Sequence, residues 1–395
     1  MQVVLFDHQA WRQDFYPLSL TRPVANLRTG ILTLNEKWER LLGCPVSFYT
    51  VTHLQALFPL SDSRETVLLI RGDVLGDIQA VAQLEILQPG EMLEDERGLW
   101  AGKLSKADLP LALRDTFSWK VRPTAFIPET IRYPEDLFLK NGAEIIKDYA
   151  LITQGRISVP LSDTNRVLGD QLFIEPGARV ECANINTLEG PVYIGKDSQV
   201  FEGCNIRGPF ALGEGAILKM GTQVYSNVSI GPHSTIGGEL NTCVVWGYSA
   251  KGHHGYFGSG VMGAWCNWGA GSSNSNLKNT YSEVTLFHYS TKRKRKTGLQ
   301  VCGLIMGDYV RCGINTAFYT GCVIGTGVQV ASLDPIQGYL PDFSWVERQQ
   351  QATYRLEKLF ETLKLVFQRR NRIFAESETR MLKQVFILTE EFRNL

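Results

Sequence analysis

The fold of most of this chain is decided by residues 194–237, which read IGKDSQVFEGCNIRGPFALGEGAILKMGTQVYSNVSIGPHSTIG. Every sixth residue is aliphatic, in the series Ile194, Val200, Ile206, Leu212, Leu218, Val224, Ile230 and Ile236. Glycine follows several of these positions, as expected of turns that need a positive φ. A period of six fits no α-helix, so the stretch predicts the short strands and corners of a parallel β-helix built from hexapeptide repeats.

The repeat extends in both directions, and we expect the β-helix to occupy residues 166–335. Ile174 and Val180 begin a first coil, and a second run restarts after residue 305 with Met306, Cys312, Phe318, Ile324 and Val330. Each stacked aliphatic side chain contributes roughly 1.5–3 kcal/mol by burial. Each coil contacts only its neighbours, so the two ends need caps.

Both flanks of the repeat region have the composition of caps or further domains. Residues 336–395 carry Leu356, Leu359, Leu363 and Phe367 at helical spacing, which predicts a pair of amphipathic helices broken near residues 375–377. We interpret this pair as a cap or an oligomer contact. Residues 1–165 mix strand-like runs at 3–6, 46–49 and 67–70 with a helix-like run at 31–42, which predicts an α/β domain.

Composition limits the function classes. With 40 acidic and 40 basic residues, the chain has no global field to hold nucleic acid or an anionic membrane. No run approaches the ~18 apolar residues of a membrane span, and the amino-terminal MQVVLFDHQAW lacks the basic start of a signal peptide. The eight cysteines never form C-x-x-C, so we expect reduced structural thiols and a cytoplasmic protein.

The repeat is interrupted by a polar segment, residues 251–279, which reads KGHHGYFGSGVMGAWCNWGAGSSNSNLKN. Adjacent histidines, asparagines and clustered glycines do not suit a β-helix interior, so they have another use or face water. The segment resembles the acetyltransferase half of the GlmU-like family, the bifunctional glucosamine-1-phosphate acetyltransferases and N-acetylglucosamine-1-phosphate uridyltransferases. NSNLKN, the run at 297–327 and LPDFSW at 340–345 extend the resemblance, to an alternate form of that family, over nearly the whole chain.

This resemblance implies a left-handed β-helix, acetyl-CoA as co-substrate, a sugar phosphate and a nucleotide as small-molecule partners, and a homotrimer. It implies that His253 is the general base, that Tyr256, Asn267 and Asn276 orient the sugar, and that Ala270 meets the acetyl group. An imidazole titrating near neutrality suits the removal of a proton from an attacking amine. We expect His253 and His254 to point to opposite sides of a strand, so that only His253 acts.

Further residues complete the predicted acetyl-transfer site. We expect Gly269, Ala270 and Gly271 to contact acetyl-CoA, and the backbone amides of such a glycine-rich corner can stabilise the tetrahedral oxyanion. Lys219 and Glu239 match substrate-binding positions of the family, whereas Asn241 stands where a second phosphate-binding lysine is expected. The basic run at 292–296 is either a solvated loop or a contact for the phosphates of CoA, which would involve Lys296 and Thr297.

The amino-terminal domain resembles sugar-nucleotide pyrophosphorylases in WRQDFYPLSLTRPVAN at residues 11–26 and in the Gly72-Asp73 pair after a strand. The resemblance implies that Arg12, Arg22, Arg28 and Asp73 bind a nucleotide, with Asp73 holding Mg²⁺. Two features depart from that family: residues 6–10 contain no glycine to cradle a triphosphate, and Val24 replaces a lysine. Active uridylyl transfer and a degenerate domain kept for folding are both open.

Two other functions compete with acetyl transfer. A zinc lyase on the same scaffold needs three converging histidines, which His233, His253, His254 and His288 could supply. A non-catalytic scaffold that holds a sugar nucleotide predicts binding without turnover.

Overall fold

The computed structural model describes residues 2–61, 65–114, 116–348 and 350–393. The chain divides into two compact units. The amino-terminal unit comprises residues 1–13, 21–27 and 32–132, and the β-helix unit comprises residues 14–20, 28–31 and 133–395. Residues 133–165, assigned from the sequence to the first domain, therefore pack with the β-helix.

The amino-terminal unit is an α/β domain, as predicted. Its six-stranded sheet has the order β2-β1-β3-β5-β4-β6. The strands are β1 (Gln2–Phe6), β2 (Val46–Tyr49), β3 (Thr66–Arg71), β4 (Glu91–Asp95), β5 (Gly98–Ser105) and β6 (Lys120–Val121). The helices of this unit are α1 (Gln9–Arg12), α2 (Leu34–Leu42), α3 (Ile78–Glu85) and α4 (Leu109–Ala112).

Alternation along the strands gives this sheet a core on each side. Leu5 and Ile70 point to the side where Trp38 of α2 and Val81 of α3 are buried. The intervening residues of β1 and β3 point to the other side, with Leu109 of α4. Both faces are therefore covered, which explains why β1 and β3 are almost wholly apolar.

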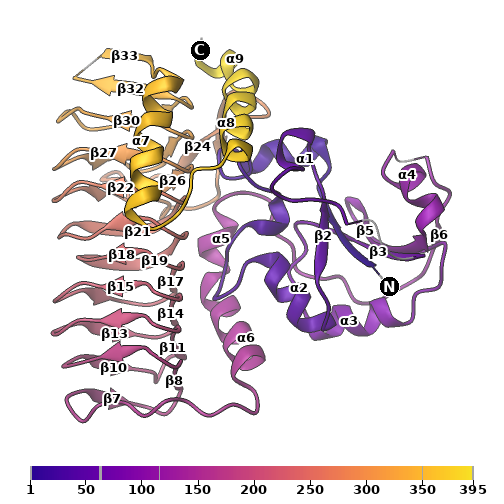
Figure 1. Ribbon diagram of the computed structural model, residues 1–395, viewed down its shortest axis with the longest axis horizontal. Coiled ribbons are helices and arrows are strands. Elements are labelled where there is room, and N and C mark those ends of the chain that lie inside the picture. The colour runs from indigo at the N-terminus through magenta and orange to yellow at the C-terminus, as the bar shows by residue number, and fades with distance from the viewer. Residues whose placement is uncertain (1, 62–64, 115, 349, 394–395) are drawn as a thin grey trace. The chain divides into compact units, whose positions relative to one another are not determined.

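The repeat region is a parallel β-helix, whose short strands stack as a column from β7 to β33 in Figure 1. Each coil contributes to three faces, here called A, B and C in chain order. Face A contains β7 (Arg166–Leu168), β10 (Asn184–Asn186), β13 (Asn205–Arg207), β16 (Gln223–Val224), and the first halves of β19 (Glu239–Val245) and β21 (Tyr256–Met262); β23 (Ser273–Asn274) and β28 (Ala317–Phe318) continue it.

Face B contains β8 (Leu172–Ile174), β11 (Val192–Ile194), β14 (Phe210–Leu212), β17 (Val228–Ile230), the second halves of β19 and β21, β26 (Leu304–Met306), β29 (Cys322–Ile324) and β31 (Tyr339–Leu340). Face C contains β9 (Arg179–Val180), β12 (Gln199–Val200), β15 (Ile217–Leu218), β18 (Thr235–Ile236), β20 (Ala250–Lys251), β22 (Asn267–Trp268), β27 (Arg311–Cys312), β30 (Gln329–Val330) and β32 (Ser344–Glu347), closed by antiparallel β33 (Gln350–Thr353).

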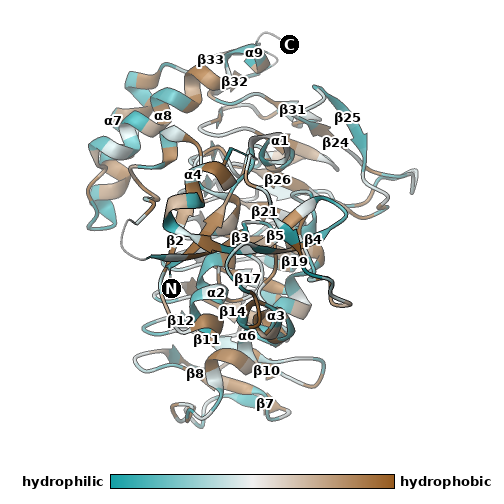
Figure 2. Ribbon diagram, turned by 90° about the vertical axis from the view of Figure 1, so that its right-hand side faces the viewer, coloured by the Kyte–Doolittle hydropathy of each residue, from teal (hydrophilic) through white to brown (hydrophobic). Residues whose placement is uncertain are grey.

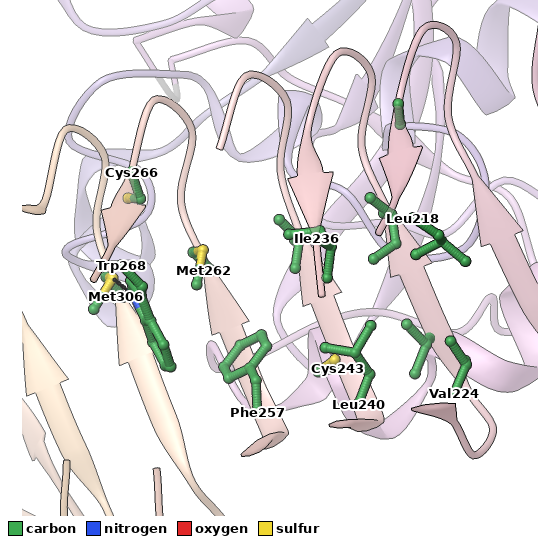
Figure 3. Packing of buried hydrophobic residues seen from close by; sticks show 14 of the residues in the cluster. Leu218, Val224, Ile236, Leu240, Cys243, Phe257, Met262, Cys266, Trp268 and Met306 are labelled. Atoms are coloured by element: carbon green, nitrogen blue, oxygen red, sulfur yellow. Dashed lines mark hydrogen bonds between the residues drawn. The ribbon is translucent and has the colours of Figure 1, made fainter. Parts of the chain in front are cut away.

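The predicted aliphatic ladder forms the interior of the column. Ile194, Leu218 and Ile236 are buried in one continuous core, and Met306 and Ile324 of the second run belong to it too. Figure 3 shows Leu218, Ile236 and Met306 among the buried side chains of this core. Between the two runs the core changes to larger side chains, with Phe257 and Trp268 packed edge to face.

Helices cover parts of the column. α5 (Asp136–Leu139) and α6 (Asn141–Thr153) pack against face B, where Asn141 Nδ2 donates to the Asn227 carbonyl. The predicted carboxy-terminal pair is α7 (Leu356–Arg369) and α8 (Glu376–Leu388), followed by α9 (Glu390–Arg393). The pair begins later than predicted, because β31 to β33 continue the coils as far as Thr353. No helix in the described ranges is long and apolar enough to cross a membrane.

The corner between faces B and C carries a stack of aromatic rings that docks α7. The rings of Tyr248 and Trp265 lie 4.2 Å apart and nearly parallel, and Phe367 of α7 stacks on Trp265 at 3.8 Å. Tyr248 and Trp265 both adopt a positive φ, so successive corners present their rings in register. The stack therefore fixes the end of α7 beside face C.

Candidate functional site

A cavity of about 740 Å³ lies on face C where the end of α7 approaches it. It brings together five of the residues predicted from the sequence, namely Lys219, His253, Asn267, Gly269 and Ala270. Thr235, Ala250 and Gly252 line the face C side, and Val366, Arg369 and Arg370 come from the α7 segment. We call this cavity the face C pocket.

His253 lies at the corner where the chain passes from face C to face A. The expectation that the two histidines occupy a strand is wrong: both lie in a bend between β20 and β21, and both are exposed. They are nevertheless distinguished, because only His253 lines the face C pocket. The ring of His254 lies beside Gly271, where an added Cβ would come 3.4 Å from Nε2.

The imidazole of His253 makes no hydrogen bond to any residue within the described ranges, so its nitrogens are available to a ligand. Its backbone, in contrast, is held from inside the β-helix. Lys251 Nζ donates to the carbonyl oxygens of Gly237 at 2.9 Å, His253 at 3.1 Å and Gly255 at 2.6 Å. Burial lowers the pKa of Lys251 to about 8.

The next corner along face C, Gly269 to Gly271, holds the amides predicted to stabilise an oxyanion. The N–H of Gly269 donates to the Cys312 carbonyl at 3.0 Å, and the N–H of Gly271 donates to the His254 carbonyl at 3.2 Å. These two amides are therefore used by the coils. Among described residues, the N–H of Ala270 has no such partner, which makes it the available donor at this corner.

Other predicted substrate residues gather on face A instead. Asn276 Nδ2 donates to Tyr256 Oη at 2.9 Å and to Ser259 Oγ at 3.1 Å. Glu239 is the register partner of Tyr256 on the adjacent strand. Burial, together with the nearby Cys243 and Glu239, raises the pKa of the Tyr256 hydroxyl. The hydroxyl fills space that a side chain on residue 258 would occupy, which explains the glycine there.

The basic run lies on a hairpin inserted between β23 and β26, formed by β24 (Thr285–His288) and β25 (Arg293–Lys296). β25 is strongly hydrophilic in Figure 2. Lys296 approaches Glu283 at 3.6 Å, and the Thr297 hydroxyl donates to the Val284 carbonyl at 2.8 Å. Neither Lys296 nor Thr297 lines the face C pocket.

Of the predicted nucleotide-binding residues, Arg12 and Asp73 are engaged with other residues of the amino-terminal unit. Arg12 is buried, and its guanidinium donates to Asp7 at 2.7 Å and to the Arg22 carbonyl at 3.2 Å. Asp7 also accepts from the amide of Val24, the residue that stands where a lysine was expected. Arg28 belongs to the β-helix unit, where its guanidinium donates to the Ile31 carbonyl.

Asp73 is fully buried between two arginines. One carboxylate oxygen accepts from Arg71 Nε at 2.7 Å, and the other pairs with Arg97. Arg71 pairs with Asp95 as well. Burial alone would lower the pKa of Arg71, but hydrogen bonding to Asp95 and the charge of Asp73 raise it. In this arrangement Asp73 offers no free oxygen to Mg²⁺.

Within the described ranges, no three His, Cys, Asp or Glu side chains gather as they would around a metal ion. His288 bonds to Asp14 at 2.9 Å, and His233 packs on the ring of Tyr248. All eight cysteines are free and six are buried.

Four residues of the pocket region were missed by sequence reasoning. Lys251 takes the core position next to Ile236 on the following coil. Because the coils are shorter here, this position does not fall on the six-residue period, so the sequence pattern did not reveal it. Arg311 directly precedes the core residue Cys312 and therefore points outward from face C. α7 ends at Arg369, and Arg370 follows directly. Two adjacent arginines at the end of a predicted helix were the only sign of them in the sequence.

Comparison with known proteins bears on the amino-terminal part of the chain. Residues 3–157 match the family described as sugar nucleotidyl transferase. The bifunctional protein GlmU of Methanocaldococcus jannaschii is 25% identical over 140 residues, which is 35% of this chain and 33% of that protein. The match thus spans about a third of that relative. Residues 3–157 are thus similar to the sugar nucleotidyl transferase family, and the resemblance to GlmU-like proteins is supported over about a third of the chain.

Solved structures with similar coils include the polysialic acid O-acetyltransferase OatWY, at 14% identity and a TM-score of 0.30, covering 48% of this chain and 87% of that one. The N-acyltransferase AntD of Bacillus cereus, solved with dTDP and coenzyme A, has 13% identity and a TM-score of 0.23, covering 51% and 91%. Perosamine N-acetyltransferase of Caulobacter crescentus has 11% identity and a TM-score of 0.19, covering 90% and 97%. At these TM-scores the solved structures add nothing to the assignment of the site.

Proposed function

We propose that the face C pocket transfers an acetyl group from acetyl-CoA to the amine of an amino-sugar phosphate, with glucosamine-1-phosphate as the acceptor. The observation that carries the proposal is the presence in one cavity of an imidazole, His253, with no hydrogen bond to a described residue and a backbone amide, Ala270, equally available. A base and an oxyanion donor on residues that line one cavity are the two groups that acyl transfer needs.

The chemistry follows from these two groups. The amine attacks the thioester carbonyl, a C–N bond forms, and the amine proton passes to His253. The N–H of Ala270 stabilises the oxyanion of the tetrahedral intermediate. The C–S bond then breaks, and the imidazolium returns the proton to the departing CoA thiolate. General base catalysis of this kind contributes ~10²–10⁴-fold to the rate.

The acceptor needs contacts to its hydroxyls and its phosphate. Lys219 and Asn267 line the same pocket as His253, whereas Glu239, Tyr256 and Asn276 lie on face A, around the corner. A single chain therefore presents the pocket residues and the face A residues on adjacent faces. We propose that a homotrimer completes the site, with the face A residues of one copy reaching the face C pocket of a neighbouring copy.

The family match supports a nucleotide as the ligand of the amino-terminal unit, and uridylyl transfer from UTP belongs to the same proposal. For Asp73 to hold Mg²⁺, it must first leave Arg71 and Arg97.

The test is an acceptor screen with the full chain, acetyl-CoA and free thiol release as the readout, and mass spectrometry of the product. Glucosamine-1-phosphate, glucosamine and a UDP-activated amino sugar are compared, with UTP and Mg²⁺ assayed separately. We expect thiol release and an acetylated product with glucosamine-1-phosphate. Binding of sugar nucleotide without turnover of any acceptor supports the scaffold instead, and a metal-dependent lyase activity supports the zinc enzyme.

A further inference from the structure

The face C pocket holds more cations than Lys219, the one basic residue that the sequence assigned to the substrate. Besides Lys219, it is lined by Arg311, Arg369 and Arg370, and no Asp or Glu lines it. None of these four side chains forms an ion pair within the described parts of the chain. Unpaired cations facing one cavity repel one another, so they indicate an anionic ligand.

Arg311 gives the sharpest evidence. It lies on β27 of face C, and its Nε and Nη2 are buried without a hydrogen-bond partner. Burial lowers the pKa of this guanidinium. A buried donor without a partner is rare in folded proteins because it forfeits its hydration, and a charged donor forfeits more. A ligand that accepts two hydrogen bonds in a plane would satisfy it.

Arg369 and Arg370 reach the same cavity from α7. Partial burial, and then the neighbouring charge of Arg369, lower the pKa of Arg370. The helix is held in place by Phe367, which stacks on Trp265, and by Leu359 and Leu363, which are buried. The partial negative charge of a helix carboxyl end favours basic residues there, but it accounts for neither Arg311 nor its unpartnered nitrogens.

We propose that Arg311, Arg369 and Arg370 form a phosphate-binding subsite of the face C pocket, and that the carboxy-terminal helix α7 is thereby part of the binding site. Guanidinium groups bind phosphate oxygens in pairs, which suits a phosphate monoester or a diphosphate. Under the proposed function, two sources fit: the phosphates of CoA or the phosphate of the acceptor sugar. The basic run on β25 is then not required for this contact.

The test is direct binding, measured by titration calorimetry with the full chain. CoA, dephospho-CoA, pantetheine, glucosamine-1-phosphate and inorganic pyrophosphate are titrated into the wild type, an Arg369→Gln/Arg370→Gln double variant and Arg311→Gln. Lys364→Gln is the matched control, because Lys364 is an exposed cation on α7 that does not line the pocket. Thermal melts check that each variant is folded.

We expect the double variant and Arg311→Gln to weaken binding of the phosphate-bearing ligand by about 10- to 100-fold, as the loss of charge-assisted hydrogen bonds predicts. Lys364→Gln and the pantetheine titrations should be unchanged, and the loss should shrink at high salt. Loss with CoA assigns the subsite to the acyl donor, and loss with glucosamine-1-phosphate assigns it to the acceptor.

Several results would overturn the proposal: a wild type that binds none of the phosphate ligands, arginine variants that bind like the wild type, or a loss that is equal for pantetheine. The subsite and the proposed reaction fail separately. Arginine-dependent phosphate binding without acetyl transfer to any acceptor leaves the subsite standing and rejects the reaction. Acetyl transfer at the wild-type rate in all of the arginine variants supports the reaction and rejects the subsite.

Discussion

At the scale of single residues, Lys251 occupies a position that neighbouring coils give to apolar side chains. Its register partner on the preceding coil is Ile236, and Trp268 fills the equivalent position on the following coil. A charged side chain in that place destabilises the fold unless its donors are satisfied. Three carbonyl oxygens satisfy them, and one belongs to His253. Lys251 is thus a positioning residue for the proposed base.

We predict that Lys251→Met, which keeps the length of the side chain but removes its donors, lowers kcat for acetyl transfer by about 10-fold and changes KM less. The wild type should also lose activity above pH 8, because a neutral amine keeps two N–H donors for three carbonyls. The variant should lack this alkaline limb.

The contribution of Lys251 to stability should change in the opposite direction over the same pH range. The pKa of Lys251 falls from 10.5 to about 8 on folding, so between these values the unfolded chain binds more protons at this amine and its contribution rises with pH. Buried thiols such as Cys243, whose pKa is raised by burial, act in the opposite sense, so the contribution of Lys251 is read from the difference in melting temperature between the wild type and Lys251→Met. A variant with the wild-type pH profile would contradict the positioning role.

At the scale of elements, the hairpin β24–β25 is fastened to the start of α5. Arg295 pairs with Glu135, whose side chain is 4% exposed. The guanidinium of Arg295 also lies 3.7 Å from the ring centroid of Tyr133. Lys292 pairs with Glu391 of α9 at 2.7 Å. The basic run that looked from the sequence like a solvated loop or a CoA contact thus has structural partners, while its contact with CoA stays a prediction.

We predict that Arg295→Gln lowers the free energy of unfolding by about 3–5 kcal/mol at neutral pH, because it leaves the Glu135 carboxylate buried without its partner. Burial already raises the pKa of Glu135, so the variant should recover part of its stability as the pH falls and this carboxyl is protonated. Denaturant melts at two pH values measure this. Arg293→Gln, at an exposed position of the same strand, is the control, and equal melts for both variants would contradict the account.

At the scale of the whole molecule, the sequence predicted which kinds of domain are present better than it predicted the residues at which they begin and end. The six-residue period identified the β-helix core, and every aliphatic position of the ladder from Ile194 to Ile236 is buried. The period could not show that α5 and α6 pack on face B, because that contact depends on Asn141 bonding across to residues far along the chain.

The sequence predicted only part of the site, again because the rest depends on contacts between residues far apart in the chain. Motif order identified His253, Asn267 and Ala270, which lie together in the face C pocket. It could not show that Tyr256 and Asn276 face another side of the column, since a corner intervenes. Nor could it find Arg311 and Arg370, because 58 positions separate them in sequence and only the docking of Phe367 on Trp265 brings α7 to face C.

The central claim is that His253 is the base of an acetyl transfer in the face C pocket, and steady-state kinetics of His253→Ala beside His254→Ala tests it most directly. The two residues are adjacent and exposed, so each variant controls for the other's effect on folding. We predict that His253→Ala lowers kcat by about 10²-fold or more with little change in KM, and that His254→Ala has a much smaller effect. A His253→Ala variant that keeps more than half of the wild-type kcat, or inactivation by His254→Ala alone, would contradict the account.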